Sequence, residues 1–323
     1  MAAVKSGHMN GMETRPDDGR PSAAPRWPVI LMLVATMALW GGTWPVGRVV
    51  SASVNPWTAA LLRFAMAGGA LVLICILQGG LRVLRVRPAL FPQLFLLGAS
   101  GIFGYSFLFF TGLQTTDASR AGLIVGCIPA SIALCAALIA RRLPLPLAMA
   151  GILISLLGVS IVISRGNPLI LLRGDVRPGD LMILGCVFCW TAYTLLARRI
   201  MLELPPLVAV TWSCLTGTAL ILPFAIHAGF MKEIRHIDGI VWTGLVYLGV
   251  PATSLAYCGY YHAIRRIGGV ATGIFINLVP LFALLFGWLF LDEMLHAGEL
   301  AGGLLVISGV IIAMRANALR RLP

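Results

Sequence analysis

Ten apolar runs, each long enough for a helix that crosses a lipid bilayer, follow one another along this chain of 323 residues. A helix needs about 20 apolar residues to cross the hydrocarbon core of a membrane. Turn-forming or charged segments, such as 51–56 and 232–238, separate the runs. The sequence therefore predicts an all-α membrane protein with ten transmembrane helices. The expected spans are roughly 28–48, 56–78, 90–112, 118–140, 147–164, 180–200, 207–228, 239–262, 269–290 and 298–315.

The composition agrees with a membrane location. Hydrophobic residues make up 59% of the chain and charged residues 11%, whereas a soluble domain carries about 25% charged residues. A net charge of +12 would suggest nucleic-acid binding in a soluble protein. Here the basic residues lie between apolar runs, so we expect no nucleic-acid partner. Residues 1–26 are polar and mix Gly, Pro, Asp and Arg, so we expect a disordered tail.

Lys and Arg collect on alternate connections, which orients the chain. Fewer basic residues lie on the other connections, namely Arg120, Arg165, Arg173, Arg177, Lys232 and Arg235. We therefore expect an inner-membrane protein with both termini in the cytoplasm and with basic cytoplasmic loops that contact anionic lipids. The basic residues assigned to the cytoplasm are Lys5, Arg15, Arg20, Arg26, Arg82, Arg85, Arg87, Arg141, Arg142, Arg198, Arg199, Arg265, Arg266, Arg315, Arg320 and Arg321.

The two halves of the sequence repeat one another. An offset of 150 places Trp40 on Trp190 and Pro56 on Pro206. An offset of 151 places AGILISLLGVSIV at 150–162 over AGGLLVISGVIIA at 301–313. Each half has five spans, an odd number, so the halves have inverted orientations, as in many secondary transporters. The expected organisation is a first repeat at 27–165, a loop at 166–179, a second repeat at 180–316 and a basic tail at 317–323.

Several segments in order resemble the EamA type of the drug/metabolite transporter superfamily. They are ALWGGTWPVGR at 38–48, NPWTAALLRFAMAG at 55–68, WTAYTLLARRI at 190–200 and GGVATGIFINLVPLFALLFGWLFLDE at 268–293. The resemblance covers 27–315 and implies ten helices in two repeats that line one central cavity. It also implies transport of small metabolites, with amino-acid export favoured. One departure is that Arg141 and Arg142 stand where the second half has Asp292 and Glu293.

The segment 38–48 carries unusual residues for a spanning helix. Two glycines remove side chains, and Pro45 leaves a backbone carbonyl free one turn earlier. Trp40 and Trp44 share a helix face, and with Thr43 we expect them to line a cavity. Two alternatives stay open: Trp44 belongs to the aromatic belt at the membrane surface, and the glycines serve helix packing.

Two arginines lie near the outer ends of the first two spans. Arg48 ends the first span, and Arg63 lies about 10 Å into the second, which is costly unless it faces water, an acid or backbone carbonyls. We expect Arg63, together with Arg48, to create a positive potential that helps a carboxylate enter or leave. The alternative is an arginine that ties helix ends together.

Matching prolines break the fourth and ninth spans near the middle of the membrane. They are Pro129 and Pro280, and Asn277 lies one turn before the latter. We expect Asn277 to contact substrate, with a hydrogen bond to a neighbouring helix as the alternative. Other polar or aromatic positions expected to line the cavity are Tyr105, Gln114, Trp190, Tyr193 and Tyr257.

No carboxylate lies near the middle of a predicted span, so the sequence shows no proton relay and leaves the coupling ion open. The motif GxxxxGK[ST] is absent, which argues against ATP as a direct energy source. Cys186 and Cys189 have CxxC spacing, but no His or carboxylate lies near them, so we expect packing rather than a metal site. We expect no cofactor.

The sequence thus predicts a secondary transporter that moves a small organic metabolite by alternating access. The favoured cargo is an amino acid, with aromatic or apolar types suggested by the aromatic residues of the expected cavity. Other transported substrates remain open: purines, sugar phosphates and cationic compounds. A membrane-embedded enzyme or a scaffold is a further alternative, although no catalytic grouping of His, Ser and Asp is visible at helical spacing.

Overall fold

The computed structural model describes residues 27–141, 145–167, 176–267, 272, 275–294 and 296–319. Within these ranges the chain forms helices and turns and no strand. The expected tail at 1–26 and most of the expected loop at 166–179 lie outside the described residues.

The described residues of the first half form ten helical segments. The predicted third span consists of two α-helices, α3 and α4, joined by a π-helical segment, η3. They are α1 (Trp27–Ser53), α2 (Pro56–Gly79), η1 (Leu81–Leu84), η2 (Pro88–Leu90), α3 (Phe91–Gly98), η3 (Ala99–Gly104), α4 (Tyr105–Leu113), α5 (Ala118–Val125), α6 (Ile128–Ile139) and α7 (Pro146–Ile163).

The second half follows the same plan, again with a π-helical segment, η5. Its helix α16 continues to Leu319, into the stretch expected as a tail. The segments are α9 (Pro178–Ile200), α10 (Pro206–His227), α11 (Phe230–Glu233), η4 (Ile234–His236), α12 (Gly239–Gly249), η5 (Val250–Leu255), α13 (Ala256–Ile267), α15 (Leu278–Leu291) and α16 (Ala297–Leu319).

Eight helical stretches of the described residues are long and apolar enough to cross a membrane. Two shorter apolar helices, Leu278–Leu291 and Ala297–Ala313, occupy the last two predicted spans. Prolines set several of the starts, because α2, α7, α9 and α10 each begin on a proline, whose missing N–H costs nothing in the first turn. The all-helical membrane architecture predicted from the sequence is confirmed.

The internal repeat reappears in details of the backbone. The π-helical segments η3 and η5 begin 151 residues apart, at Ala99 and Val250. Arg141 and Asp292, which are separated by the same distance in sequence, both have a positive φ, at 50° and 52°, where α6 and α15 end. Non-glycine residues rarely adopt this conformation, so its occurrence at both positions shows that the two halves share one backbone plan.

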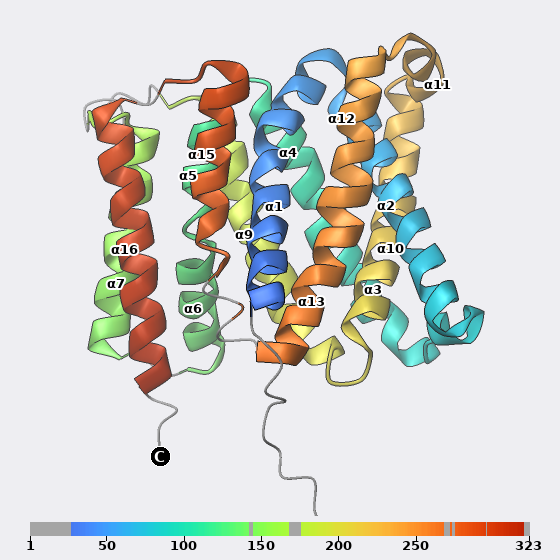
Figure 1. The fold of residues 1–323 in the computed structure, drawn as a ribbon, viewed down its shortest axis with the longest axis horizontal. Helices are drawn as coiled ribbons and strands as arrows, with labels where there is room; N and C mark the ends of the chain where they lie inside the picture. Colours follow the sequence, from blue (N-terminus) through green and yellow to red (C-terminus); the bar gives the residue numbers. More distant parts are fainter. Residues whose placement is uncertain are drawn as a thin grey trace, which may run out of the picture.

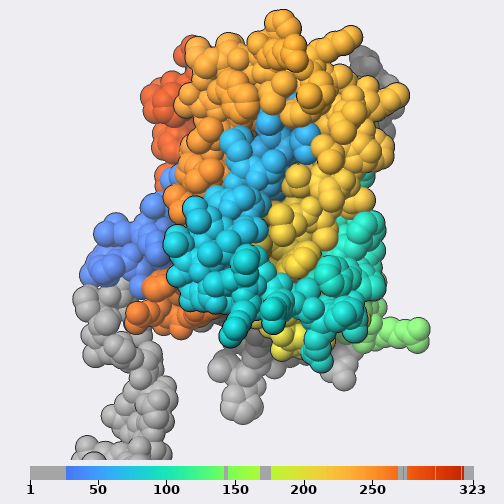
Figure 2. Space-filling view, turned by 90° about the vertical axis from the view of Figure 1, so that its right-hand side faces the viewer, coloured from blue at the N-terminus to red at the C-terminus, as the bar shows by residue number. Residues whose placement is uncertain are grey.

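The helices form one bundle in which the halves interlock (Figure 1). α7 pairs with α16 at one side of the bundle and α2 pairs with α10 at the other, each helix with its counterpart from the other half. Between them, α1 contacts α13 and α15, while its counterpart α9 contacts α4, α5 and α6. Figure 2 shows α2 running obliquely between α12 and α10 on one face of the molecule.

The α7–α16 pair is held by glycines that let the two backbones touch. A methyl group at Gly158 would lie 2.6 Å from the carbonyl oxygen of Gly302, and one at Gly302 would lie 2.8 Å from that of Gly158. Gly151 and Gly309 face one another in the same reciprocal way. Such close approach is how helices associate where lipid, rather than water, surrounds them.

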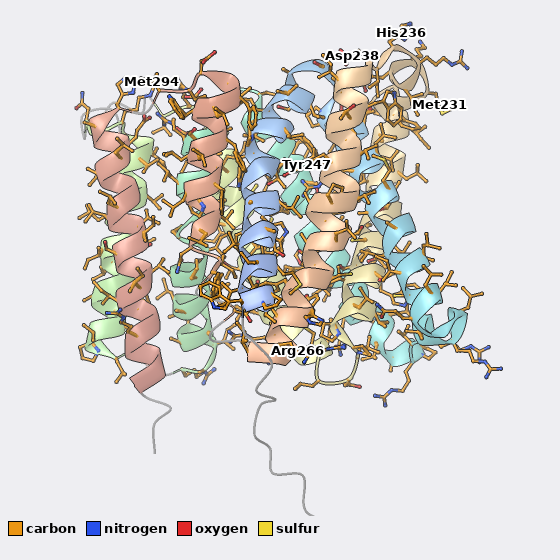
Figure 3. All side chains as sticks on the ribbon, in the orientation of Figure 1. Met231, His236, Asp238, Tyr247, Arg266 and Met294 are labelled. Carbon is orange, nitrogen blue, oxygen red and sulfur yellow. The ribbon has the colours of Figure 1, made fainter. Side chains whose placement is uncertain are left out.

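α1 begins and α16 ends at the same end of the bundle, which we call the terminal end (Figure 1). The opposite end, called the distal end, carries the connections from α4 to α5 and from α15 to α16. Met294 is labelled at the distal end and Arg266 at the terminal end in Figure 3.

Candidate functional site

Arg63 lies in the interior of the bundle on α2. Its side chain is only 8% exposed, yet its Nε and Nη1 atoms have no hydrogen-bond partner among the described residues. The described carboxylates also form no ion pair with it. A buried guanidinium whose N–H groups no described residue satisfies is energetically costly.

Aromatic side chains surround Arg63. The guanidinium carbon is 5.0 Å from the ring centre of Phe64 and 5.3 Å from that of Phe109, within the range of cation–π attraction. Tyr105 stacks on Phe109 with ring centres 6.0 Å apart, and Tyr257 is buried in the same hydrophobic cluster as Phe64 and Phe109. We call Arg63, Phe109, Tyr105 and Tyr257 the interior site.

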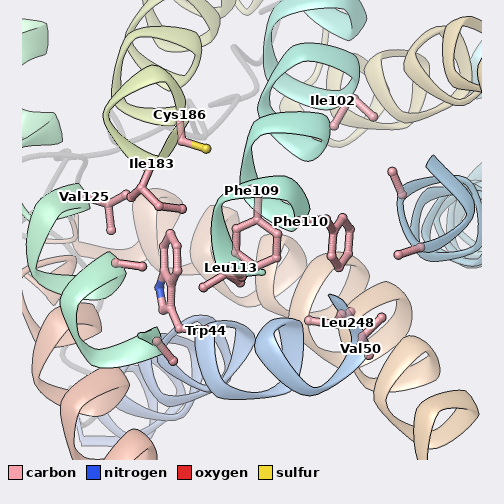
Figure 4. Close-up of a cluster of buried hydrophobic side chains, with 14 of the residues drawn as sticks. Trp44, Val50, Ile102, Phe109, Phe110, Leu113, Val125, Ile183, Cys186 and Leu248 are labelled. Atoms are coloured by element: carbon pink, nitrogen blue, oxygen red, sulfur yellow. The ribbon is translucent and has the colours of Figure 1, made fainter. Parts of the chain in front are cut away.

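The two tryptophans of the first span lie on different sides of the interior site. Trp44 is buried, and its ring centre is 5.1 Å from that of Phe109 (Figure 4). Trp40 instead contacts Tyr257 and Tyr260, with ring centres 5.6 Å and 5.2 Å away. Trp44 is therefore inside the bundle and not in an aromatic belt at the membrane surface.

The glycines of the first span serve helix packing. A methyl group at Gly41 would lie 2.3 Å from Cβ of Phe282 on α15, and one at Gly42 would lie 2.3 Å from the hydroxyl oxygen of Tyr247 on α12. That hydroxyl donates a hydrogen bond of 2.8 Å to the carbonyl of Leu39. Gly42 thus leaves room for the Tyr247 side chain, which bonds to the backbone of α1, whereas the carbonyl that Pro45 leaves without its helical partner is that of Gly41.

Two expected lining residues already have partners within the chain. The hydroxyl of Thr43 donates to the carbonyl of Trp40 at 2.6 Å, within the same helix. The amide of Gln114 lies after α4 and donates to the carbonyl of Ser51 at 3.3 Å, which ties α4 to the end of α1. Both side chains are therefore already engaged in hydrogen bonds to the backbone of α1.

A second aromatic group joins α4 to α9. The ring centres of Tyr105 and Trp190 are 5.4 Å apart, and those of Trp190 and Tyr193 are 5.3 Å apart. Tyr193 is buried, and its hydroxyl has no hydrogen-bond partner among the described residues. This group extends the interior site toward α9.

Both proline-bearing spans are interrupted. α5 ends at Val125 and α6 begins at Ile128, so Pro129 is the second residue of the new helix. α15 begins at Leu278, directly after Asn277, and Pro280 lies in its first turn. Asn277 is half-buried and forms no side-chain hydrogen bond with the described residues.

Arg48 lies at the distal end, where it connects three segments of the chain. Nη1 donates to the carbonyl of Thr116, Nη2 is 3.2 Å from Oδ1 of Asp117, and Nε is 3.5 Å from Oε1 of Glu293. Asp117 also accepts a hydrogen bond of 2.8 Å from Arg177. Arg48 and Arg63 therefore differ: the first joins segments at the distal end, and the second forms no ion pair with any described residue.

Sequence reasoning missed a buried ion triad at the distal end. Arg120 of α5 pairs with Asp180 of α9 and with Glu299 of α16. The signals were available, because Arg120 lies within an apolar span and both carboxylates lie in the first turns of later spans. Their meeting could not be read from the sequence, since the partners are 60 and 179 residues apart.

A pocket of about 310 Å³ opens beside this triad. Its lining is strongly charged and comes from both halves of the chain. The residues are Arg48, Asp117, Arg165, Arg177, Leu291, Asp292, Glu293, Met294, His296 and Glu299. Within the described part of the chain, no group of three or more His, Cys, Asp or Glu side chains could hold a metal ion.

The fold and the interior site define a class of protein. Two five-helix halves that repeat one another in inverted orientation are the architecture of many secondary transporters. The sequence matches the EamA-like transporter family over residues 27–164 and 177–315, one match for each half. The chain belongs to this family and is a multi-pass membrane transporter, as its resemblance had indicated.

Individual relatives extend over nearly the whole chain. The uncharacterized transporter YyaM of Bacillus subtilis is 26% identical over 88% of this chain and 93% of its own length. A "probable terminal-alkyne amino-acid exporter" of Streptantibioticus cattleyicolor is 26% identical over 90% of this chain and 94% of its own length. A crystal structure of a protein 24% identical has a TM-score of 0.61 and covers 88% of this chain and 97% of that chain, which shows the shared fold.

Proposed function

We propose that this transporter carries amino acids, with aromatic or apolar side chains favoured, and that Arg63 binds their carboxylate. The observation that carries the proposal is the pair of unpartnered, buried nitrogens on Arg63. A planar guanidinium binds a carboxylate through two parallel hydrogen bonds. The substrate thus supplies the negative charge that the surrounding chain lacks.

The walls of the interior site support an apolar or aromatic substrate side chain. Phe109, Trp44, Trp190 and Tyr257 present ring surfaces, which stack favourably on other rings and on apolar groups. A cationic compound is disfavoured at this site, because Arg63 would repel it. The relative in Streptantibioticus cattleyicolor is named a probable terminal-alkyne amino-acid exporter, which supports the same substrate class.

Alternating access supplies the movement. The two halves meet at the distal end through the ion pair of Arg48 with Glu293, which joins the end of α15 to α1, while Arg48 also pairs with Asp117 at the start of α5 in its own half. Breaking these pairs would open the interior site toward the distal side. Inverted halves with one backbone plan give two conformations of similar energy, one open to each side of the membrane.

The excess of basic residues on the connections at the terminal end supports an inner-membrane location in which this end faces the cytoplasm. Export then runs from the terminal end to the distal end, and the basic cytoplasmic loops contact anionic lipids. The interior site binds and releases its cargo unchanged, so we assign the protein no enzymatic activity.

Counterflow in proteoliposomes tests this function. Vesicles are loaded with unlabelled phenylalanine or threonine, and uptake of the labelled amino acid is followed for the wild type and for Arg63→Gln. Arg87→Gln is the matched control, because Arg87 is exposed at the terminal end and pairs with Glu203. We expect uptake of phenylalanine by the wild type and by Arg87→Gln, and its loss in a folded Arg63→Gln protein.

Two results would contradict the proposal. Folded wild-type protein that exchanges neither amino acid would remove the substrate class, and the assay would move to nucleobases and sugar phosphates. Full exchange by Arg63→Gln would remove Arg63 from the binding site and leave it a structural role.

A further inference from the structure

The ion triad at the distal end is not balanced in charge. Arg120, Asp180 and Glu299 are 1%, 0% and 2% exposed, so water reaches none of them freely. One guanidinium contacts both carboxylates, through Nη1 to Oε1 of Glu299 at 2.8 Å and through Nη2 to Oδ2 of Asp180. With both carboxylates ionised, the buried group would carry one uncompensated negative charge, which is strongly unfavourable away from water.

The hydrogen bonds that complete the triad supply dipoles, while the further cationic groups near it are Arg177, which is itself paired with Asp117 at 2.8 Å, and the imidazole of His296. The Thr116 hydroxyl donates to Oδ1 of Asp180 at 3.0 Å, and the backbone N–H of His296 donates to Oε2 of Glu299 at 3.0 Å. Independently, Nε of Arg120 is buried without a hydrogen-bond partner among the described residues, so the cation itself is incompletely satisfied there. The simplest species that neutralises the group is a proton on one carboxyl.

Glu299 is the carboxylate with access to the distal side. It lines the 310 Å³ pocket, whereas Asp180 does not. Nδ1 of His296 lies 3.3 Å from Oε2 of Glu299, and the His296 side chain is 72% exposed. An imidazole can both accept and donate a proton, so this exposed ring gives a route between solvent and the buried carboxyl. The other charged groups that face this pocket are Arg48, Asp117, Arg165, Arg177, Asp292 and Glu293.

We propose that the triad is a proton-binding site, in which Glu299 takes up one proton from the distal side through His296. The proton adds to a carboxylate oxygen of Glu299, and the group changes from a net charge of −1 to zero. Arg120 then remains paired with Asp180 alone. Because Arg120 belongs to the first half of the chain and Glu299 to the second, protonation weakens one of the links that hold the two halves together at the distal end.

The link between proton binding and the movement of the two halves rests on the proposed transport function. The proton site does not. The site itself can be tested without any substrate. Infrared absorption of purified protein in detergent detects the C=O stretch of a protonated carboxyl, which shifts when H₂O is replaced by D₂O. The spectrum is recorded as pH is varied for the wild type, Glu299→Gln, Asp180→Asn and the control Glu203→Gln, whose parent side chain pairs with Arg87 at the exposed surface.

We expect the wild type and Glu203→Gln to keep one such band at neutral pH, where exposed carboxyls are ionised, and to lose it only at higher pH, and we expect Glu299→Gln to lack it at neutral pH. Asp180→Asn should also lose the band in the neutral range, because Arg120 and Glu299 then balance one another and Glu299 ionises. This second variant keeps the test decisive if the first fails to fold. No pH-dependent band in the wild type, or an unchanged band in both triad variants, would overturn the proposal.

A transport measurement then distinguishes the proton-site hypothesis from the amino-acid hypothesis. If phenylalanine exchange is detected, its rate should depend on the pH of the distal side in the wild type and lose that dependence in Glu299→Gln. If phenylalanine is not exchanged, the amino-acid assignment fails while the infrared result for the proton site stands or falls by itself.

Discussion

The side chain of Glu293, which follows α15, caps the first turn of α5 in the other half of the chain. Its Oε1 accepts the backbone N–H of Ala118 and its Oε2 that of Ser119, both at 2.8 Å. The first N–H groups of a helix have no partner within the helix, and the positive end of the helix dipole favours a carboxylate there. The cap therefore also holds the two halves together at the distal end.

Removing this cap should destabilise the protein. We expect Glu293→Ala to lower the free energy of unfolding by about 1–2 kcal/mol, in the range found for helix caps. Asp292→Asn is the control, because Asp292 is exposed and Asn tolerates its positive φ. Thermal unfolding in detergent measures both variants. An equal loss in the two would show that the cap contributes nothing.

Gly42 should be intolerant of even a methyl group. Gly42→Ala would place Cβ 2.3 Å from the hydroxyl of Tyr247, which must move and release the carbonyl of Leu39. We expect a loss of about 1–3 kcal/mol. Gly69→Ala, where a new Cβ meets nothing within 4 Å, should be neutral or slightly stabilising. Tyr247→Phe in the same chain should recover part of the Gly42→Ala loss, and no recovery would contradict the contact.

The glycine contact between α7 and α16 should be equally sensitive. A methyl group at Gly309 would lie 2.4 Å from the backbone nitrogen of Ser155 and 2.5 Å from the carbonyl oxygen of Gly151. Backbone atoms cannot turn aside as a side chain can, so Gly309→Ala should cost at least ~1–3 kcal/mol by forcing the helices apart. Thermal unfolding of Gly309→Ala against Gly69→Ala checks this, and similar melting temperatures would refute it.

Arg120 should be essential for folding only while its acidic partners remain. Arg120→Gln leaves two buried carboxylates without their cation, which typically costs about 3–5 kcal/mol. The triple variant Arg120→Gln, Asp180→Asn and Glu299→Gln removes all three charges, so we expect it to regain much of that stability. Arg87→Gln, at an exposed pair, should cost no more than about 1 kcal/mol. Expression yield and unfolding temperature distinguish these outcomes.

The helices of this protein could be predicted from its sequence because apolar length decides them. Nearly every predicted span agrees with the structure within a few residues, since prolines such as Pro56, Pro146 and Pro206 mark helix starts as plainly as hydropathy marks the spans. The inversion of the halves followed from an odd number of spans in each. These features are local or periodic, so the sequence displays them directly.

The contacts between helices could not be predicted in the same way. The role of Gly42 depends on Tyr247, and the charge of the triad depends on three residues from three helices. No spacing in one segment reports such meetings, because they arise only when the helices pack. Arg63 could be singled out by its depth, but only the structure shows that its Nε and Nη1 have no hydrogen-bond partner among the described residues.

The reciprocal contacts of α7 and α16 have a consequence for the origin of the chain. Gly151 meets Gly309 as Gly158 meets Gly302, and the repeat relates Gly151 to Gly302 and Gly158 to Gly309. This is the self-complementary pattern of a two-fold symmetric dimer interface, in which a surface binds its own copy. A protein of half the length, carrying this glycine face, would pair with a second molecule inserted upside down, so gene fusion had only to join two subunits that already fitted.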